Sequence, residues 1–267
     1  MPVPSLLAVF AHPDDESLSA GGVLARHAAA GARTAVVTAT WAADSPRAAE
    51  LADALRILGV GPPRMLGYAD ARVPRSAPDG ARFCDAPLDD AVRRLVAHIR
   101  EFRPEVVVTH DAYGGLSGHA DHVHTHRVTV LAAQAAGLGR LFPEAGDPWQ
   151  PSALYLATHP HSAVSALTEV VGPHETVYSV PDDLVTTVVD VRPWLERKTA
   201  AVLAHRTEVA RGAVPGLIAE LPPRSRERLL GTEWYIRQDL APKAPGPAKD
   251  VRTELTATAR PPGTAAP

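Results

Sequence analysis

The chain has 267 residues, 45% of them hydrophobic, which is enough to bury the core of one sizeable α/β domain without disulfides. Its 27 basic and 30 acidic side chains give a formal net charge of -3, which excludes a general attraction to nucleic acid or to an anionic membrane surface. Cys84 is the single cysteine, so an intrachain disulfide and a cysteine-based zinc cluster are excluded as well.

The start of the chain predicts a cytoplasmic protein. Residues 1–4 lead directly into an apolar stretch, without the basic segment and cleavage site of a signal peptide. No apolar run approaches the roughly 20 residues that span a bilayer. We therefore expect a reducing compartment, and neither a membrane nor a nucleic acid as partner.

The first forty residues predict a strand, a helix and a second strand. Residues 5–11 form a continuous apolar run that ends at the sequence HPDDE, residues 12–16, because proline and acidic residues terminate strands. The alanine-rich residues 18–31 indicate a helix, and residues 35–40 a second buried strand. This βαβ order favours a parallel sheet with a right-handed crossover.

The middle of the chain continues the alternation. Residues 47–58 have the apolar spacing of an amphipathic helix that Gly59 closes, whereas residues 61–87 resemble a loop. Residues 88–102 are again predicted to be helical, and the valine-rich residues 106–109 form another buried strand.

The last part of the chain adds further elements and then loses its periodicity. We expect a helix, two strands and a second helix at residues 128–136, 153–157, 185–189 and 194–209. The tail at 241–267 is rich in Pro, Ala, Thr and Gly, and it is predicted to be disordered. Residues 1–240 should therefore form one domain with a Rossmann-like three-layer α/β fold and a mostly parallel sheet.

Two polar clusters follow predicted strands, at residues 12–16 and 119–126. The second cluster holds four histidines and one aspartate within eight residues. Ligands of open α/β sheets bind beyond the carboxyl ends of the strands, where both clusters should lie. Imidazole and carboxylate groups are donors that zinc accepts, and two histidines with one carboxylate also suit ferrous iron. The clusters predict a divalent metal whose identity stays open.

These residue types also suit the hydrolysis of an amide. Asp14 and Asp15 should point in different directions from a turn, so one can bind a metal while its neighbour accepts a proton from the attacking water. A nearby protonated histidine would stabilise the oxyanion and protonate the leaving amine. His119 and His122 are three residues apart, and His122 and His126 are four apart, so the spacing alone allows two metal-binding pairs.

A series of short motifs occurs in order along about residues 5–238. AHPDDE at 11–16 is followed by GGVL at 21–24 and by GHADH at 118–122. Later segments, such as GTEWY at 231–235, continue the series. Together they resemble the LmbE/PIG-L family of zinc-dependent N-deacetylases. Within it they look most like the actinobacterial mycothiol-pathway branch, which contains a deacetylase of N-acetylglucosaminyl-inositol and a mycothiol-conjugate amidase.

The resemblance implies roles for the matching residues. His12, Asp15 and His122 would bind zinc. Asp14 would be the general base, and His119 would be the acid and the oxyanion partner.

The resemblance also implies a substrate-binding pair, Arg47 and Asp70, which would hold sugar hydroxyls. The spacing of Arg47 equally favours an i,i+3 pair with Glu50 on a solvated face. Asp121 is interpreted as a carboxylate that orients a metal-binding histidine, and the later histidines of the cluster as packing or orienting groups.

Three departures from the family pattern lie at the expected pocket wall. Residues 41–46 replace a Gly- and Glu-rich stretch, and Ala120 stands where proline is common. Residues 116–118 stand where some relatives have a tyrosine just before His119. These changes concern substrate choice rather than chemistry.

We therefore expect a metal-dependent hydrolase that removes an N-acetyl or other N-acyl group from a small glucosamine-containing molecule, with Zn²⁺, Fe²⁺ or another divalent metal as cofactor. A mycothiol-conjugate amidase is the alternative. A non-catalytic sugar-binding relative is disfavoured, because binding alone needs neither Asp14 nor His119. Association into a homo-oligomer is compatible with this composition.

Overall fold

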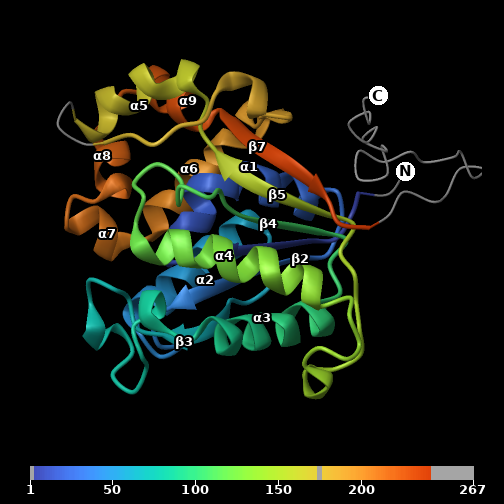
Figure 1. Cartoon of the computed structure of the whole chain (residues 1–267). Helices are drawn as coiled ribbons and strands as arrows, with labels where there is room; N and C mark the ends of the chain where they lie inside the picture. Colours follow the sequence, from blue (N-terminus) through green and yellow to red (C-terminus); the bar gives the residue numbers. More distant parts are fainter. Residues whose placement is uncertain (1–2, 173–175, 242–267) are drawn as a thin grey trace, which may run out of the picture.

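A computed structural model of the chain describes residues 3–172 and 176–241 (Figure 1). Its centre is a seven-stranded sheet in the order β3-β2-β1-β4-β5-β7-β6. The strands are β1 Leu6–Phe10, β2 Thr34–Thr40, β3 Arg64–Tyr68, β4 Val106–His110, β5 Ala153–Thr158, β6 Thr187–Asp190 and β7 Thr232–Asp239. Strands β1 to β5 pair in parallel, and β7 pairs antiparallel with β5 and β6. The mostly parallel sheet confirms the predicted α/β fold.

Helices cover both faces of this sheet. They are α1 Asp15–Ala29, α2 Pro46–Leu58, α3 Leu88–Phe102, α4 Ala120–Ala135, α5 Val164–Val171, α6 Leu195–Ala204, α7 Arg206–Ala210, α8 Val214–Glu220 and α9 Pro223–Leu230. Helices α3 and α4 share one core with the sheet, and α1, α2 and α6 share the other (Figure 1). The molecule therefore has three layers, as predicted.

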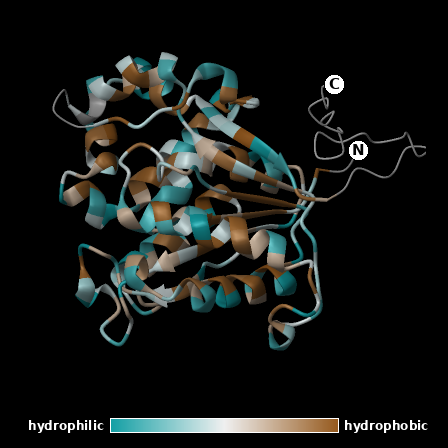
Figure 2. Cartoon of the chain, in the orientation of Figure 1, coloured by the Kyte–Doolittle hydropathy of each residue, from teal (hydrophilic) through white to brown (hydrophobic). Residues whose placement is uncertain are grey.

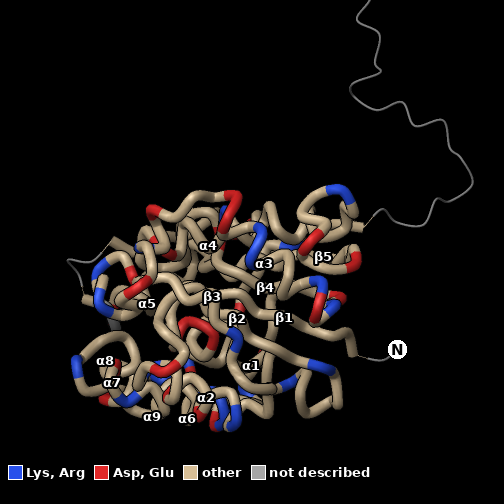
Figure 3. The backbone as a smooth tube through the Cα atoms, turned by 90° about the horizontal axis from the view of Figure 1, so that it is seen from below, with Lys and Arg blue, Asp and Glu red and all other residues tan. Residues whose placement is uncertain are grey.

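The apolar strands explain why both faces are covered. All five residues of β1 are buried, and alternate residues enter opposite cores: Leu7 and Val9 on one face, Leu6 and Ala8 on the other. Such strands need helices on both sides, and Figure 2 shows the central strands as the apolar interior. On the outside, Lys and Arg residues are interspersed with Asp and Glu residues (Figure 3).

The strand order reverses between β1 and β4. Strand β1 pairs with β2 on one side and with β4 on the other, and the chain continues outward in both directions. Leu6 lies opposite both Thr34 and Val106, so the three parallel strands start at one edge and their carboxyl ends face the opposite edge. This is the topological switch point, where open α/β sheets bind their ligands.

Several predicted elements were wrong in detail. Residues 61–87 contain the strand β3 and two short 3₁₀ turns rather than only a loop. Strand β3 is an edge strand with only Leu66 and Tyr68 buried, so it lacks a continuous apolar run. The helix predicted at 194–209 is two helices that break at His205. The strand predicted at 185–189 is Thr187–Asp190.

Two helix starts were placed too late because polar residues form the first turns. Helix α1 begins at Asp15 rather than Leu18, and its acidic first turn suits the positive end of a helix dipole. Helix α4 begins at Ala120 rather than Val128, so the histidine cluster forms its first two turns.

The strand β7 and the helices α5, α8 and α9 were not predicted. The predicted tail lies outside the described residues from position 242 onward.

Candidate active site

The HPDDE sequence forms the turn from β1 into α1. Asp14 has φ 129°, a conformation that costs an L-residue about 1–3 kcal/mol. The turn sends the two consecutive carboxylates to different partners. Asp15 accepts the backbone N–H of His12 at 2.8 Å, and Asp14 lies 3.1 Å from Arg47.

The second segment is the loop from β4 into α4. Asp111 fixes this loop, since it accepts the backbone N–H groups of Tyr113 and Gly115 at 3.1 and 2.9 Å. The ring Nδ1 of His122 lies 3.0 Å from the carbonyl oxygen of Gly114. This contact places the proton of neutral His122 on Nδ1 and leaves Nε2 free to bind a cation.

Three donor atoms from these two segments form a nearly equilateral triangle. His12 Nδ1 lies 3.0 Å from His122 Nε2 and 3.3 Å from Asp15 Oδ2, and the third side, between His122 and Asp15, is 3.3 Å. Ligands of a tetrahedral zinc ion are about 3.3 Å apart, as bonds of roughly 2.0–2.2 Å require. The triangle joins residues 110 positions apart, and its donor chemistry fits a divalent cation.

The described residues also contain competing donor groups. Three overlapping sets have ligand atoms within 4.8 Å of one another: His12, His119 and His122; Asp15, His110 and His122; and His12, Asp70, His119 and Asp121. Asp121 lies 3.1 Å from the other ring nitrogen of His12, and its oxygens already accept the N–H groups of Ala71 and Cys84. Because its oxygens are already engaged, Asp121 fits an orienting carboxylate.

The pKa values of the three triangle residues determine which of them carries a proton. Burial lowers the pKa of His12, but hydrogen bonds to Asp121 and Asp15 outweigh burial and raise it to about 10. Burial raises the pKa of Asp15, yet the histidines around it, His122 first, hold it well below its usual range. Burial holds the pKa of His122 well below its usual range. In the metal-free protein near neutral pH, His12 is therefore the member of the triangle that carries a proton.

Asp14 and Arg47 form a buried pair beside this triangle. Arg47 is 4% exposed, contacts Asp14 at 3.1 Å and Glu208 at 3.1 Å, and lies over the ring of Trp41. Burial raises the pKa of Asp14 to about 7, while the charge of Arg47 opposes the shift. The alternative solvated pair of Arg47 with Glu50 is wrong.

Glu50 instead bonds to the backbone and hydroxyl of Thr207.

His119 caps α4 next to the triangle. Its Nδ1 accepts the backbone N–H of Asp121 at 3.2 Å, so the neutral ring carries its proton on Nε2. Burial lowers the pKa of His119 to about 4. The rings of His12 and His122 lie 4.7 and 5.2 Å from it, between centroids. His119 is thus a neutral N–H donor at this position.

Asp70 reaches the cluster from the loop after β3. Its Oδ2 lies 3.4 Å from His12 Nε2, while its Oδ1 accepts the N–H groups of Arg72 and Val73. The structure therefore brings all eight predicted site residues to one edge of the sheet: His12, Asp14, Asp15, Arg47, Asp70, His119, Asp121 and His122.

Sequence reasoning gave no role to three buried groups here. Glu16 and His205 are both 0% exposed and lie 3.0 Å apart, and His110 stacks on His122 at 4.1 Å between ring centroids. Glu16 belongs to the HPDDE sequence, which is the signal that could have marked it. His205 is 189 residues away and has no local signal.

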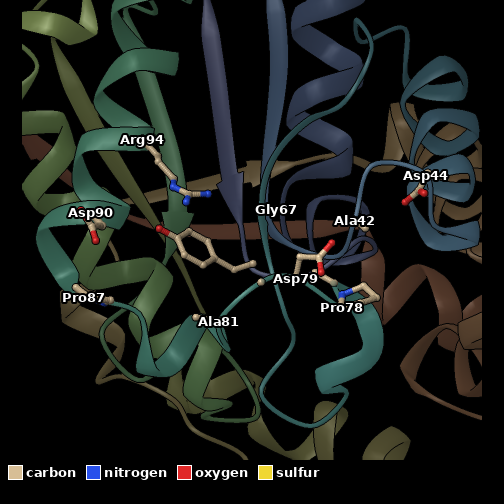
Figure 4. Close-up of a pocket in the computed structure, with 12 residues that line it drawn as sticks. Ala42, Asp44, Gly67, Pro78, Asp79, Ala81, Pro87, Asp90 and Arg94 are labelled. Atoms are coloured by element: carbon tan, nitrogen blue, oxygen red, sulfur yellow. The ribbon is translucent and has the colours of Figure 1, made fainter.

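A separate hollow of about 590 Å³ lies beside the edge strand β3. Figure 4 shows Arg94 and the carboxylates of Asp44, Asp79 and Asp90 along it. Tyr68 also lines the hollow. None of the eight predicted site residues lines this hollow. It is a different feature from the histidine cluster.

Comparison with known proteins places the chain among deacetylases. Residues 7–133 match the family model PIG-L, GlcNAc-PI de-N-acetylase. The 1D-myo-inositol 2-acetamido-2-deoxy-alpha-D-glucopyranoside deacetylase of Rhodococcus jostii is 40% identical, over 88% of this chain and 87% of that protein. The chain belongs to the PIG-L family. This confirms the resemblance drawn from the motifs.

Two solved structures share the fold of this chain but are named for different reactions. The N,N'-diacetylchitobiose deacetylase from Pyrococcus horikoshii matches with a TM-score of 0.59 at 17% identity, over 88% of this chain and 84% of that chain. GalB, the 4-carboxy-2-hydroxymuconate hydratase of Pseudomonas putida, matches with 0.56 at 19% identity, over 92% and 100%. One fold thus serves hydrolysis and hydration, so the reaction must be argued from the site.

No described helix of this PIG-L family member has the length and apolar content to cross a membrane.

Proposed function

We propose that the chain is a divalent-metal-dependent deacetylase that hydrolyses the N-acetyl group of a small glucosamine-containing molecule. The observation that carries the proposal is the triangle of His12, Asp15 and His122, with the carboxylate of Asp14 paired with Arg47 and outside the triangle. The Rhodococcus relative is named for an N-acetylglucosaminyl inositol, and 40% identity over most of both chains supports the same substrate class here. The small-molecule substrate and the single cysteine support a cytoplasmic location.

The three triangle residues would hold the metal. Two imidazole nitrogens and one carboxylate oxygen suit Zn²⁺ best, and Fe²⁺ is compatible with the same set. When bound, the cation supplies Lewis-acid activation of the attacking water and of the amide carbonyl. Asp121 holds the other nitrogen of His12, and Gly114 holds the other nitrogen of His122. Each ring can therefore turn a lone pair toward the triangle once His12 has lost its second proton.

Asp14 would accept a proton from the water that attacks the amide carbon. A general base works best with a pKa near the operating pH, and burial raises the pKa of Asp14 to about 7. Arg47 holds the carboxylate at 3.1 Å and prevents it from joining Asp15 as a ligand. The two neighbouring carboxylates thereby keep separate tasks.

His119 would complete the reaction from the other segment. Its Nε2–H can donate a hydrogen bond to the oxyanion that forms as water adds. A neutral imidazole has no second proton to give, so the leaving nitrogen takes the proton that Asp14 accepted from the water as the C–N bond breaks. Arg47 and Asp70 flank this space. We propose that they hold sugar hydroxyls, Asp70 through Oδ2, since its Oδ1 is occupied by the turn.

The test is product release from a panel of amides by the metal-loaded protein. We expect acetate and a new primary amine, in equal amounts, from N-acetylglucosaminyl-inositol or another N-acetylglucosaminide. Cleavage of only a larger, thioether-bearing mycothiol amide would establish the amidase alternative. No amine from any substrate, with metal bound, would overturn the proposed function.

A further inference from the structure

We propose that Glu16 and His205 are positioning residues that hold the backbone of Asp14 in the conformation in which it can act as base. The inference rests on the proposed function. Glu16 Oε2 accepts the backbone N–H of Asp14 at 3.0 Å, and Glu16 Oε1 lies 3.0 Å from His205 Nε2. The hydroxyl of Ser17 also donates to Oε1.

The backbone of Asp14 needs this support. At φ 129° it adopts a conformation that L-residues rarely populate, and it persists only where the surroundings impose it. Asp14 stands at the N-cap of α1 but makes no side-chain capping bond, because its carboxylate faces Arg47. The carboxylate of Glu16, two residues further on, takes the Asp14 N–H instead.

His205 makes the buried position of Glu16 tenable. Both side chains are 0% exposed, and a buried carboxylate is stable only with donors around it. His205 lies at the break between α6 and α7, so a distant part of the chain supplies the donor. Glu16 bonds to Asp14, Ser17 and His205, and the described contacts of these two residues include none of the triangle atoms. They act on the reaction through Asp14.

A matched control pair joins α6 and the strand β7 to the middle of α1. Lys198 on α6 lies 2.7 Å from Glu233, and each side chain is 2% exposed. Glu233 accepts the backbone N–H groups of Gly22 and Val23 in the middle of α1. This pair is buried like Glu16 and His205 and joins the same helix α1 to its neighbours, and its described hydrogen bonds do not involve Asp14.

The kinetic test compares three variants at saturating metal. Glu16→Ala should lower kcat about 100-fold, the scale expected when a reacting group shifts by about 1 Å, with KM and metal content unchanged. Glu16→Gln should recover most of this loss, because its amide oxygen can still accept the Asp14 N–H. Glu233→Gln should lower the thermal midpoint and leave kcat near that of the wild type.

Two kinetic results would overturn the inference. One is a wild-type kcat for Glu16→Ala. The other is an equal loss of kcat in Glu16→Ala and Glu233→Gln. Such a result would mean that any weakening of the contacts between α1 and its neighbours lowers kcat. Should Glu16→Ala fail to fold, His205→Asn carries the same test. It leaves Glu16 in place without its imidazole partner, and we expect a loss of about tenfold.

A structural readout separates this inference from the proposed function. In a crystal structure of Glu16→Ala or His205→Asn, the backbone of Asp14 should leave the positive-φ region. Failure of the wild type to release any amine would reject the proposed function alone. An Asp14 backbone that keeps its φ near 129° in both variants would reject the positioning role alone.

Discussion

Helix α1 meets two buried carboxylate clusters, one at its first turn and one at its middle. At the middle, Glu233 is saturated, since it accepts two backbone N–H groups, the Tyr235 hydroxyl and the Lys198 ammonium. The packing there is also tight, because a Cβ on Gly22 would lie 2.4 Å from the Val191 side chain. Both carboxylate oxygens of Glu233 are therefore engaged in hydrogen bonds that hold the fold together.

The first turn of α1 is built differently. Asp14 has a strained backbone, and Arg47 Nε and His205 Nδ1 nearby are among the buried polar atoms of the described residues that have no hydrogen-bond partner. Unpartnered buried polar atoms are rare and costly, and strained residues cluster at functional sites. The contrast indicates that the cluster at the middle of α1 stabilises the fold, whereas the first turn is strained and positions reactive groups.

The largest expected effect is the loss of the metal from the triangle at the first turn of α1 when His122 is replaced. His122→Ala should abolish both bound metal and turnover, because it removes one corner of the triangle. The matched control is His126→Ala, which removes a histidine of the same helix that contacts the carbonyl of His110. Elemental analysis should find metal in the control and none in His122→Ala. Full metal content in His122→Ala would instead favour the donor set around Asp70.

Asp14→Asn should separate metal binding from catalysis. The amide keeps the size of the carboxylate but cannot accept the proton, so kcat should fall about 10²–10⁴-fold with metal retained. Steady-state kinetics and elemental analysis check both parts. Unchanged turnover would remove Asp14 from the mechanism and weaken the contrast between the two clusters.

Glu233→Gln should show the opposite pattern at the middle of α1. It leaves the Lys198 ammonium buried beside a neutral amide, so the free energy of unfolding should fall by about 3 kcal/mol. Urea denaturation measures this change, with the exposed Glu227→Gln as control. A Glu233→Gln protein with normal stability and lost turnover would place this cluster in the catalytic machinery.

Arg47→Met should change the pH dependence of activity. The charge of Arg47 lowers the pKa of Asp14, so its removal should raise that pKa further above about 7. Because the base must be ionised, the acid limb of the kcat/KM profile should move to higher pH. Arg56→Met on the same helix removes an exposed arginine paired with Asp53 and should leave the profile unchanged. A shift of Arg47→Met to lower pH would contradict the electrostatic account.

The smallest effect concerns the proton on His12. Since the pKa of His12 is raised to about 10 in the metal-free protein, metal binding near neutral pH should release about one proton. The apparent metal affinity should therefore rise with pH and level off above the pKa of His12. Calorimetry in buffers of different ionisation enthalpy counts the proton. Binding without proton release would mean that the ion does not displace it from His12.

Local patterns predicted the ends of β1 and β4 well. The apolar runs before residues 12–16 and 110–111 fixed two strand ends, and parallel pairing brought them together at one edge. The partner of Glu16 could not be predicted, because His205 is 189 residues away. The helical pattern of the sequence also continues across His205, so it does not reveal the break between α6 and α7. Strand β3 was missed since an edge strand has only half of its side chains buried.

The most direct test of the account is the position of the metal in a crystal of the zinc-loaded protein, located by anomalous scattering. The account predicts one ion bound at about 2.0–2.2 Å by His12 Nδ1, Asp15 Oδ2 and His122 Nε2, with Asp14 unligated. An ion coordinated by Asp70 and Asp121 instead, or no ordered ion at the triangle, would contradict it.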